Sequence, residues 1–158
     1  MGRIRMPGLM TGDEINAFLR GPIIARLATV QPGGAPYIAP VWQAWDGERM
    51  YIVGRAGSGF VDHVRNEPRV AVSCADDVNP EHTRVLIEGR AEIVEGPAPM
   101  TGRMLQIAEE MAVRYMGQDG PMYIRRTADR PRCLIAVTPE SIVSWAGGDW
   151  HPRYVEDA

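Results

Sequence analysis

The chain has 158 residues, of which 45% are hydrophobic and 23% are charged, and its formal net charge is −3. This size and composition predict an ordinary soluble globular chain, with one domain over 1–158 and a flexible N-terminal segment over 1–10. The acidic balance, without a basic cluster, makes nucleic acid and anionic membranes poor partners. No segment has the pattern of a membrane span or a signal peptide, so we expect a cytoplasmic protein.

The chain contains no lysine, because all 17 basic residues are arginines. A pyridoxal phosphate enzyme needs a lysine for its Schiff base, and a P-loop nucleotidase needs one at the phosphates. Both classes are excluded. The sequence also lacks His/Cys pairs at zinc-ligand spacing and a Ser-His-Asp order, and its acid pair Glu109-Glu110 on the long helix is most simply a solvated face. We therefore expect neither a metal site nor a hydrolytic centre.

The first third of the chain predicts a short helix followed by antiparallel strands. A capping box over 11–14 begins the helix, and Gly21-Pro22 ends it. Turn signals rich in proline, glycine and aspartate then separate three strands, predicted over 23–30, 37–45 and 49–53.

The most informative segment is the turn between the third strand and a short helix over about 58–66. It contains Gly54, Arg55, Gly57 and Ser58. Such a turn is typical of a phosphate site, because backbone N–H groups and the helix dipole favour an anion that arginine can bind. The glycine spacing is not that of the dinucleotide fingerprint. A structural alternative stays open, in which Ser58 only caps the helix and the glycines only form the turn.

The rest of the chain predicts further strands around one long helix over 97–115. The strands are expected over 70–75, 83–94, 133–137 and 141–145. Gly89 lies inside one of them and indicates a bulge or tight bend. The helix has an apolar face that either fills the core or borders a ligand pocket, formed by Met104, Ala108, Met111 and Tyr115. A turn-rich segment over 117–132 contains Arg125, Arg126, Arg130 and Arg132.

These elements together predict a mainly β fold, an antiparallel barrel with helical insertions. Cys74 and Cys133 both fall in predicted strands, so we expect buried thiols rather than a disulfide. His63 is expected on the exposed face of the short helix, and neither it nor His82 is assigned a role.

Several motifs follow one another in a recognisable order over residues 11 to about 95. They are Ala25-Arg-Leu-Ala-Thr-Val30, the Pro-Gly-Gly-Ala-Pro turn, Pro40-Val-Trp42, Asp46-Gly47, Ser58 ten residues before Pro68-Arg-Val70, and Glu88-Gly-Arg-Ala-Glu-Ile-Val94. This order resembles the pyridoxamine 5′-phosphate oxidase-like, flavin-binding split-barrel superfamily. The C-terminal segment looks more like the branch that uses FMN or the deazaflavin coenzyme F420 than like the true vitamin B6 oxidases. The resemblance implies a Greek-key split barrel that forms a homodimer, with the cofactor at the subunit interface.

The resemblance also implies which residues bind the cofactor. Those on this chain are Pro40, Val41, Trp42, Val53, Gly54, Arg55, Gly57, Ser58 and Phe60, and the partner subunit would supply Trp145, Trp150 and His151. Phe60 stands where the family has a phosphate-binding lysine. Loss of that contact costs about 1.5–3 kcal/mol unless Arg55 or an arginine within 125–132 replaces it. Trp42, Trp45 and Trp145 equally suit core or interface positions.

The implied function is that of an FMN- or F420-dependent oxidoreductase. Hydride would pass to or from a small planar substrate, without a dedicated catalytic residue, and pyridoxamine phosphate is not implied as the substrate. The alternative, which Phe60 favours, is a non-catalytic module that binds a flavin, a tetrapyrrole or another planar ligand on the same barrel. A structural dimer with an empty groove would leave the Arg/Gly/Ser turn and the C-terminal tryptophans unexplained. The four arginines of 117–132 favour coenzyme F420 slightly, because it has a polyglutamate tail.

Overall fold

A computed structural model describes residues 9–79 and 81–147, and antiparallel β-strands dominate these residues. They form one seven-stranded sheet in the order β2-β1-β5-β6-β7-β4-β3. The mainly β prediction is therefore confirmed. The strands are β1 (Ala25–Val30), β2 (Pro36–Val41), β3 (Ala44–Trp45), β4 (Met50–Arg55), β5 (Arg69–Ala75), β6 (Arg84–Ala98) and β7 (Arg132–Trp145).

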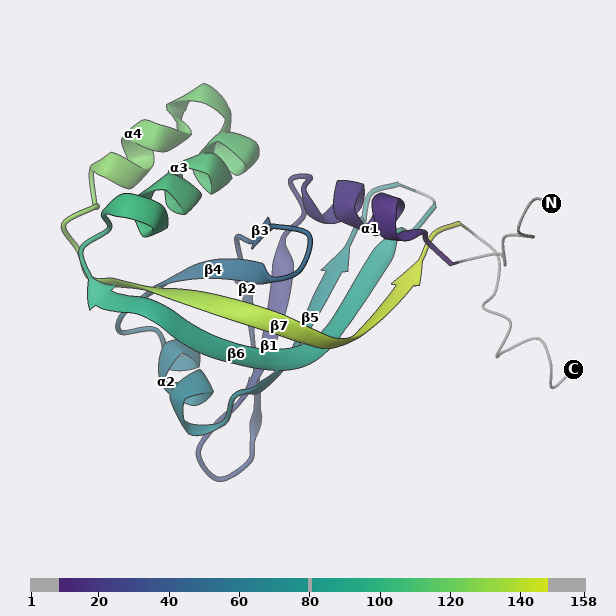
Figure 1. The fold of residues 1–158 in the computed structure, drawn as a ribbon, viewed down its shortest axis with the longest axis horizontal. Coiled ribbons are helices and arrows are strands. Elements are labelled where there is room, and N and C mark those ends of the chain that lie inside the picture. Colours follow the sequence, from purple (N-terminus) through teal and green to yellow (C-terminus); the bar gives the residue numbers. More distant parts are fainter. Residues whose placement is uncertain (1–8, 80, 148–158) are drawn as a thin grey trace, which may run out of the picture.

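The helices lie at different places around this sheet. They are α1 (Gly12–Leu19), α2 (Gly59–Asn66), α3 (Gly102–Met116) and α4 (Gly120–Arg125), with a short 3-10 turn between the last two. Figure 1 shows α3 and α4 side by side beyond one edge of β4, whereas α2 lies on the opposite side of that strand. None of the helices in the described part of the chain is long and apolar enough to cross a membrane.

The start of α1 follows the predicted capping box. The Thr11 hydroxyl accepts a hydrogen bond from the Glu14 backbone N–H at 3.2 Å and donates to the Glu14 carboxylate at 3.1 Å. This arrangement satisfies donors that a helix N-terminus otherwise leaves unpaired. The capping-box prediction is therefore confirmed, and the helix buries Leu19 against the barrel.

The predicted strand over 37–45 is broken in the structure. Strand β2 ends at Val41 and β3 begins at Ala44, because the Gln43 side chain turns into the core. Its Nε2 donates to the carbonyl of Leu19 at 2.6 Å. Trp42 and Gln43 therefore form a link between two strands, and the buried Gln43 amide ties this link to the end of α1.

The two strands predicted over 133–137 and 141–145 are one long strand, β7, paired with β6 along most of its length. Pro139 does not end it, because the register shifts beside Gly89, which stands opposite Pro139. A Cβ on Gly89 would lie 2.2 Å from the carbonyl oxygen of Thr138, so the bulge needs glycine there. The predicted irregularity at Gly89 is confirmed, and the predicted break is wrong.

Two helix predictions are corrected in the second half of the chain. The long helix begins at Gly102 rather than at residue 97, because β6 continues to Ala98. The segment over 117–132, expected to be turn-rich, contains the helix α4, which the buried side chain of Ile124 fixes against the second core cluster.

The core has two parts, and β4 and β7 contribute to both. Ile52 and Ile135 belong to the larger cluster inside the sheet, whereas Tyr51 and Leu134 belong to the cluster beneath α3. Successive residues of a strand point to opposite faces, so both strands are buried on two sides. Cys74 and Cys133 are free thiols buried in the larger cluster, as predicted.

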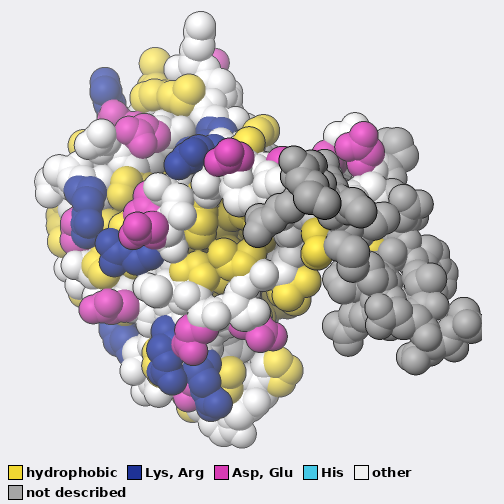
Figure 2. Space-filling view, turned by 45° about the vertical axis from the view of Figure 1, so that its right-hand side comes forward, with side chains coloured by type: hydrophobic (Ala, Val, Ile, Leu, Met, Phe, Trp, Pro, Cys, Tyr) yellow, Lys and Arg dark blue, Asp and Glu magenta, His cyan; other side chains and the backbone are white. Residues whose placement is uncertain are grey.

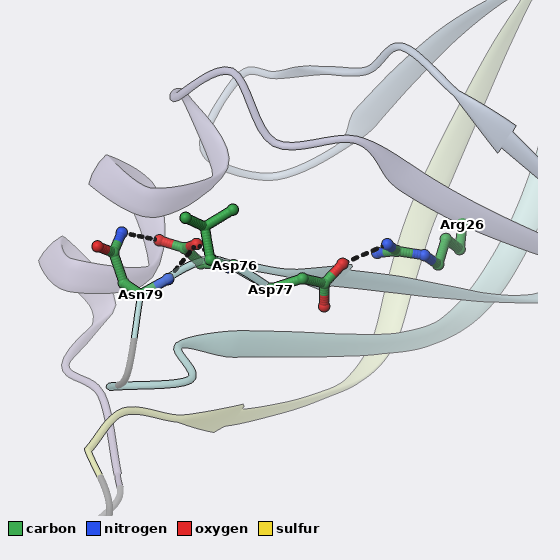
Figure 3. A network of polar contacts seen from close by, with 5 residues as sticks. Arg26, Asp76, Asp77 and Asn79 are labelled. Atoms are coloured by element: carbon green, nitrogen blue, oxygen red, sulfur yellow. Dashed lines mark hydrogen bonds and ion pairs between the residues drawn. The ribbon is translucent and has the colours of Figure 1, made fainter.

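The loop after β5 is held by its own polar contacts, which Figure 3 shows. The Asp76 carboxylate accepts hydrogen bonds from the backbone and side chain of Asn79, and Asp77 forms an ion pair with Arg26 of β1. Arg26 is thus engaged with the loop at the surface.

Candidate functional site

A cavity of about 490 Å³ lies between the end of β4, the link after β2 and the α3–α4 pair. This volume is within the range of small-molecule sites. Eight of the residues predicted to bind the cofactor line it: Pro40, Val41, Trp42, Val53, Gly54, Arg55, Ser58 and Phe60. Eight residues that the resemblance implied therefore share one cavity, and their role in binding stays a prediction.

Of the other four predicted residues, Gly57 and Trp145 are not among the described residues that line this cavity. Gly57 is exposed in the turn, and Trp150 and His151 lie outside the described residues. Trp145 ends β7, about 40 Å along that strand from Arg132 at the cavity. Its indole Nε1 donates to the carbonyl of Gly147 at 2.9 Å, and the Arg84 guanidinium lies 5.7 Å from its ring centroid.

One end of the cavity is cationic. Arg55 and Arg132 are direct cross-strand neighbours on β4 and β7, and both line the cavity. Neither guanidinium has an ion-pair partner among residues 9–79 and 81–147. Burial, reinforced by the charge of Arg55, lowers the pKa of Arg132. Two like charges held together, with only a small opposing effect from the Asp129 carboxylate on Arg132, favour an anionic ligand between them.

The position of Arg132 is fixed by local hydrogen bonds. Its guanidinium donates to the Thr127 hydroxyl at 3.1 Å and to the carbonyl of Arg130 at 3.0 Å. By contrast, the Arg125 guanidinium forms an ion pair with Glu109 at 2.8 Å. Of the four arginines that the sequence offered as replacements for the family lysine, Arg132 is the one that lines the cavity.

Ser58 lies beside this cationic end at the N-terminus of α2. It occupies the N-cap position with extended backbone, but its side chain makes no capping hydrogen bond. The structural alternative is therefore confirmed for the N-cap position of Ser58, but its hydroxyl does not cap the helix. The hydroxyl and the first N–H groups of the helix are donors that an anion in the cavity can use.

Phe60 is a core residue that also lines the cavity. Its side chain is 8% exposed and packs on Gly54, where an added Cβ would lie 2.9 Å from the phenyl ring. A lysine at this buried position would place its charge among Gly54, Val61 and the rest of the larger cluster. At the position where the resemblance implies a lysine, this chain therefore has hydrophobic packing, and Arg132 on β7 is a cation that lines the same cavity.

Another part of the cavity lining is aromatic and apolar. The Trp42 ring is stacked on Tyr115, with centroids 5.2 Å apart and planes at 14°, and it meets Tyr123 at 6.2 Å and 58°. Such surfaces suit a flat conjugated ligand. Trp45, in contrast, is a core residue whose indole Nε1 donates to Asn16 Oδ1 at 2.7 Å.

The helical wall of the cavity was only partly predicted. Ala108 and Met111 come from the apolar face of the long helix, and they are buried while they line the cavity, so both interpretations of that face apply. The residues that the sequence missed are Ile24, Met100, Tyr123 and Ile124, whereas Arg132 was one of four candidate arginines. Tyr123 and Ile124 lie in the short helix α4, and the glycines and arginines around them made this segment look like turns in the sequence.

His63 does not lie on an exposed face, so that prediction is wrong. It is 8% exposed, its Nδ1 lies 2.8 Å from the Thr29 hydroxyl, and its ring meets Tyr37 edge-on. The β1–β2 hairpin packs over this face of α2 and buries it. Within the described residues, no group of three or more His, Cys, Asp or Glu side chains is placed to hold a metal ion.

A family model described as pyridoxamine 5′-phosphate oxidase matches residues 11–146. The chain belongs to this family. The resemblance inferred from the motifs is thus confirmed, and it extends beyond the segment up to residue 95 on which those motifs lie. The fold is the split barrel of pyridoxamine 5′-phosphate oxidase-like proteins. Among curated proteins, no sequence matches this chain.

Solved structures of the family agree with this assignment. The conserved hypothetical protein Rv2991 from Mycobacterium tuberculosis is 28% identical, with a TM-score of 0.72 over 92% of this chain and 90% of that one. A structure named F420 reductase is 30% identical, with a TM-score of 0.63 over 81% of this chain and 94% of that one. The heme storage protein HutZ from Vibrio cholerae, at 17% identity and a TM-score of 0.67, covers 86% of this chain and 95% of its own and shows the fold alone.

Proposed function

We propose that this chain is an oxidoreductase that binds coenzyme F420 or FMN in the cavity and exchanges hydride with a small planar substrate. The observation that carries the proposal is a cavity lined both by the guanidinium groups of Arg55 and Arg132, which form no ion pair among residues 9–79 and 81–147, and by the aromatic side chains of Trp42 and Tyr123. This polarity matches a ligand with a phosphate at one end and a flat ring at the other.

The cationic end would hold the phosphate. A guanidinium can donate two parallel hydrogen bonds to phosphate oxygens, and two guanidinium groups on neighbouring strands can do so from one side. Ser58 and the N-terminal N–H groups of α2 would donate from another side. These donors come from three separate elements, β4, β7 and α2, so their spacing is set by the fold.

The aromatic end would hold the ring. Trp42 and Tyr123 offer flat faces, and Met100, Met111 and Ile124 exclude water from the same end. A bound flavin or deazaflavin supplies the hydride chemistry itself. The residues of the chain orient the ring, keep water away from it and leave room for a substrate.

Coenzyme F420 is the preferred cofactor of the two. The structure named F420 reductase is 30% identical to this chain, and this similarity supports F420 more than FMN. The expected role of the arginines in binding a polyglutamate tail finds less support, because Arg125 is paired with Glu109 and Arg126 contacts Met122.

The second candidate is a binding module without turnover. Phe60 favours it, because a hydrophobic side chain lines the cavity where the resemblance implies a phosphate-binding lysine, and a module that only stores a planar ligand needs no particular affinity for a phosphate. A tetrapyrrole would occupy the aromatic end through the same flat surfaces.

We also propose that the chain functions as a homodimer. Apolar side chains stand on the outer face of the sheet, where Leu86 and Val143 are cross-strand neighbours that are 41% and 53% exposed. Ile38 on β2 is 63% exposed on the same face. Figure 2 shows a face of the molecule on which hydrophobic side chains gather between charged groups. A second copy would cover such a surface and bring its own C-terminal segment near the cavity.

The experiment that tests the proposed function is anaerobic turnover. Purified protein is supplied with reduced F420 or FMN and a set of quinone, enone and nitroaromatic acceptors, and cofactor oxidation is followed by absorbance. An oxidoreductase accelerates oxidation with saturation in the acceptor, and Arg126→Ala, which changes charge outside the cavity, retains this rate. Saturable cofactor binding without acceleration would instead establish the binding module.

A further inference from the structure

The Trp42 side chain forms the aromatic wall of the cavity, although its backbone belongs to no strand. Strand β2 ends at Val41 and β3 begins at Ala44, so Trp42 lies in the link between them. A residue outside the sheet ladder lacks the pairing that fixes its neighbours. The orientation of the indole must therefore be set by contacts other than strand pairing.

Tyr115 supplies the largest of these contacts. Its ring is stacked on the Trp42 indole with centroids 5.2 Å apart, and Tyr115 is not among the residues that line the cavity. It therefore supports the indole without reaching the space that a ligand would occupy. Stacked aromatic pairs contribute beyond their buried area and restrict the ring planes of both partners.

Tyr115 is itself anchored at its hydroxyl. The phenol donates to the carbonyl of Ile23 at 2.7 Å and stands 3.4 Å from both the backbone nitrogen and the carbonyl oxygen of Gln43. Burial raises the pKa of this phenol, so it remains a neutral donor at physiological pH. The hydroxyl of Tyr115 is thus held by the backbone at Ile23 and at Gln43.

The neighbouring residue adds a second attachment to the same link. The Arg114 guanidinium donates to the carbonyl of Gln43 at 2.7 Å, and the Gln43 amide donates to Leu19 at the end of α1. The link is therefore hydrogen-bonded both to the C-terminal turn of α3 and to the end of α1. Because α3 also carries Ala108 and Met111, one helix sets both the aromatic wall and part of the apolar wall.

We propose that Tyr115 is a positioning residue that holds the Trp42 indole as a preformed wall for the ring of the bound cofactor. The expected effect of Tyr115 on cofactor affinity rests on the proposed function, whereas its effect on the orientation of Trp42 does not. Preorganisation of this kind improves affinity because the ligand need not order the side chain on binding.

The test of orientation uses apo-protein labelled with 5-fluorotryptophan. The chain has four tryptophans, and the ¹⁹F resonance of Trp42 is assigned by its loss in Trp42→Phe. Tyr115→Leu removes the stacked ring, so the Trp42 resonance alone is expected to shift and broaden. Tyr115→Phe keeps the ring and is expected to restore the resonance. Met116→Ala, an exposed change on the same turn, serves as the control.

The test of binding uses the same variants in titrations with F420 and FMN. Tyr115→Leu is expected to weaken cofactor binding about tenfold, mainly through faster dissociation, and Tyr115→Phe by no more than about twofold. An unmoved Trp42 resonance in Tyr115→Leu would overturn the proposal. A moved resonance with unchanged affinity would overturn the positioning role and leave the proposed function intact. A wild type that binds neither cofactor would overturn the proposed function, and the ¹⁹F result alone would then decide whether Tyr115 holds Trp42.

Discussion

At the scale of single residues, the contact between Gly54 and Phe60 determines the shape of the cavity floor. A Cβ at Gly54 would lie 2.9 Å from the Phe60 ring and 3.0 Å from Val61, and both side chains are buried. Gly54→Ala is therefore expected to lower the free energy of unfolding by about 1–3 kcal/mol and to displace Phe60 into the cavity. Urea denaturation measures this loss.

The matched control is Gly57→Ala in the same turn, where no heavy atom lies within 4 Å of the added Cβ. Its free energy of unfolding is expected to change by no more than about 1 kcal/mol. Equal stability of the two variants would contradict the packing assigned to Gly54.

A second residue-scale prediction concerns Cys74 and alkaline pH. Burial raises the pKa of this thiol from 9.0 to about 12 in the folded protein, with a small opposing effect from Arg26. The unfolded chain ionises first, so the stabilising contribution is complete below about pH 9 and is lost as the pH rises toward about 12. Between about pH 8.5 and about pH 10.5, wild type should lose about 2 kcal/mol more than Cys74→Ala. Parallel pH profiles of the two proteins in urea denaturation would refute this assignment.

Sequence reasoning found the cavity residues that are close together along the chain. Arg55 and Ser58 belong to one turn, and local chemistry is enough to indicate an anion site there. Arg132 was named only as one of four candidates, because its position beside Arg55 follows from the pairing of β4 with β7. The burial of His63 likewise depends on a hairpin distant in sequence, which no helical pattern can indicate.

At the scale of elements, α3 and α4 approach each other backbone to backbone at Gly120. A Cβ there would lie 2.3 Å from the carbonyl group of Ala112. Gly120→Ala should therefore push the helices apart, lower the free energy of unfolding by about 1–3 kcal/mol or more, and move the Tyr123–Ile124 wall of the cavity. Urea denaturation and near-ultraviolet circular dichroism report these changes.

Gly12→Ala, at the start of α1, is the control, since nothing lies within 4 Å of the added Cβ. Alanine is favoured over glycine in helices, so this variant should be as stable as wild type or slightly more stable. If Gly120→Ala behaved in the same way, the close approach of α3 and α4 would be wrong.

The elements that sequence reasoning misjudged are those decided by long-range contacts. Pro139 looked like a strand end, yet Gly89 on the partner strand provides a bulge that accepts it. The link at Trp42 and Gln43 looked like part of a continuous strand, because most residues around it are apolar. The sequence does not show that the Gln43 amide binds the end of α1. Helix α4 is only six residues long, and it is stabilised by burial of Ile124 rather than by its own pattern.

At the scale of the whole molecule, the proposed dimer places the outer sheet face against a second copy. Val143→Arg puts a charge into that apolar surface, so a wild-type dimer should become a monomer. Sedimentation velocity measures the change. Val78→Arg is the control, because Val78 is 91% exposed on the loop after β5. A monomeric wild type, or a Val143→Arg dimer of undiminished affinity, would reject this interface.

The most direct test of the whole account is an equilibrium titration of the apo-protein with F420 and with FMN, followed by fluorescence. Wild type is compared with Arg55→Ala, Arg132→Ala and the exposed control Arg126→Ala. The account predicts sub-micromolar binding of one cofactor, a loss of about ten- to a hundred-fold in each cavity variant, and wild-type affinity in the control. Binding of both cofactors weaker than about 100 μM, or an equal loss in all three variants, would contradict it.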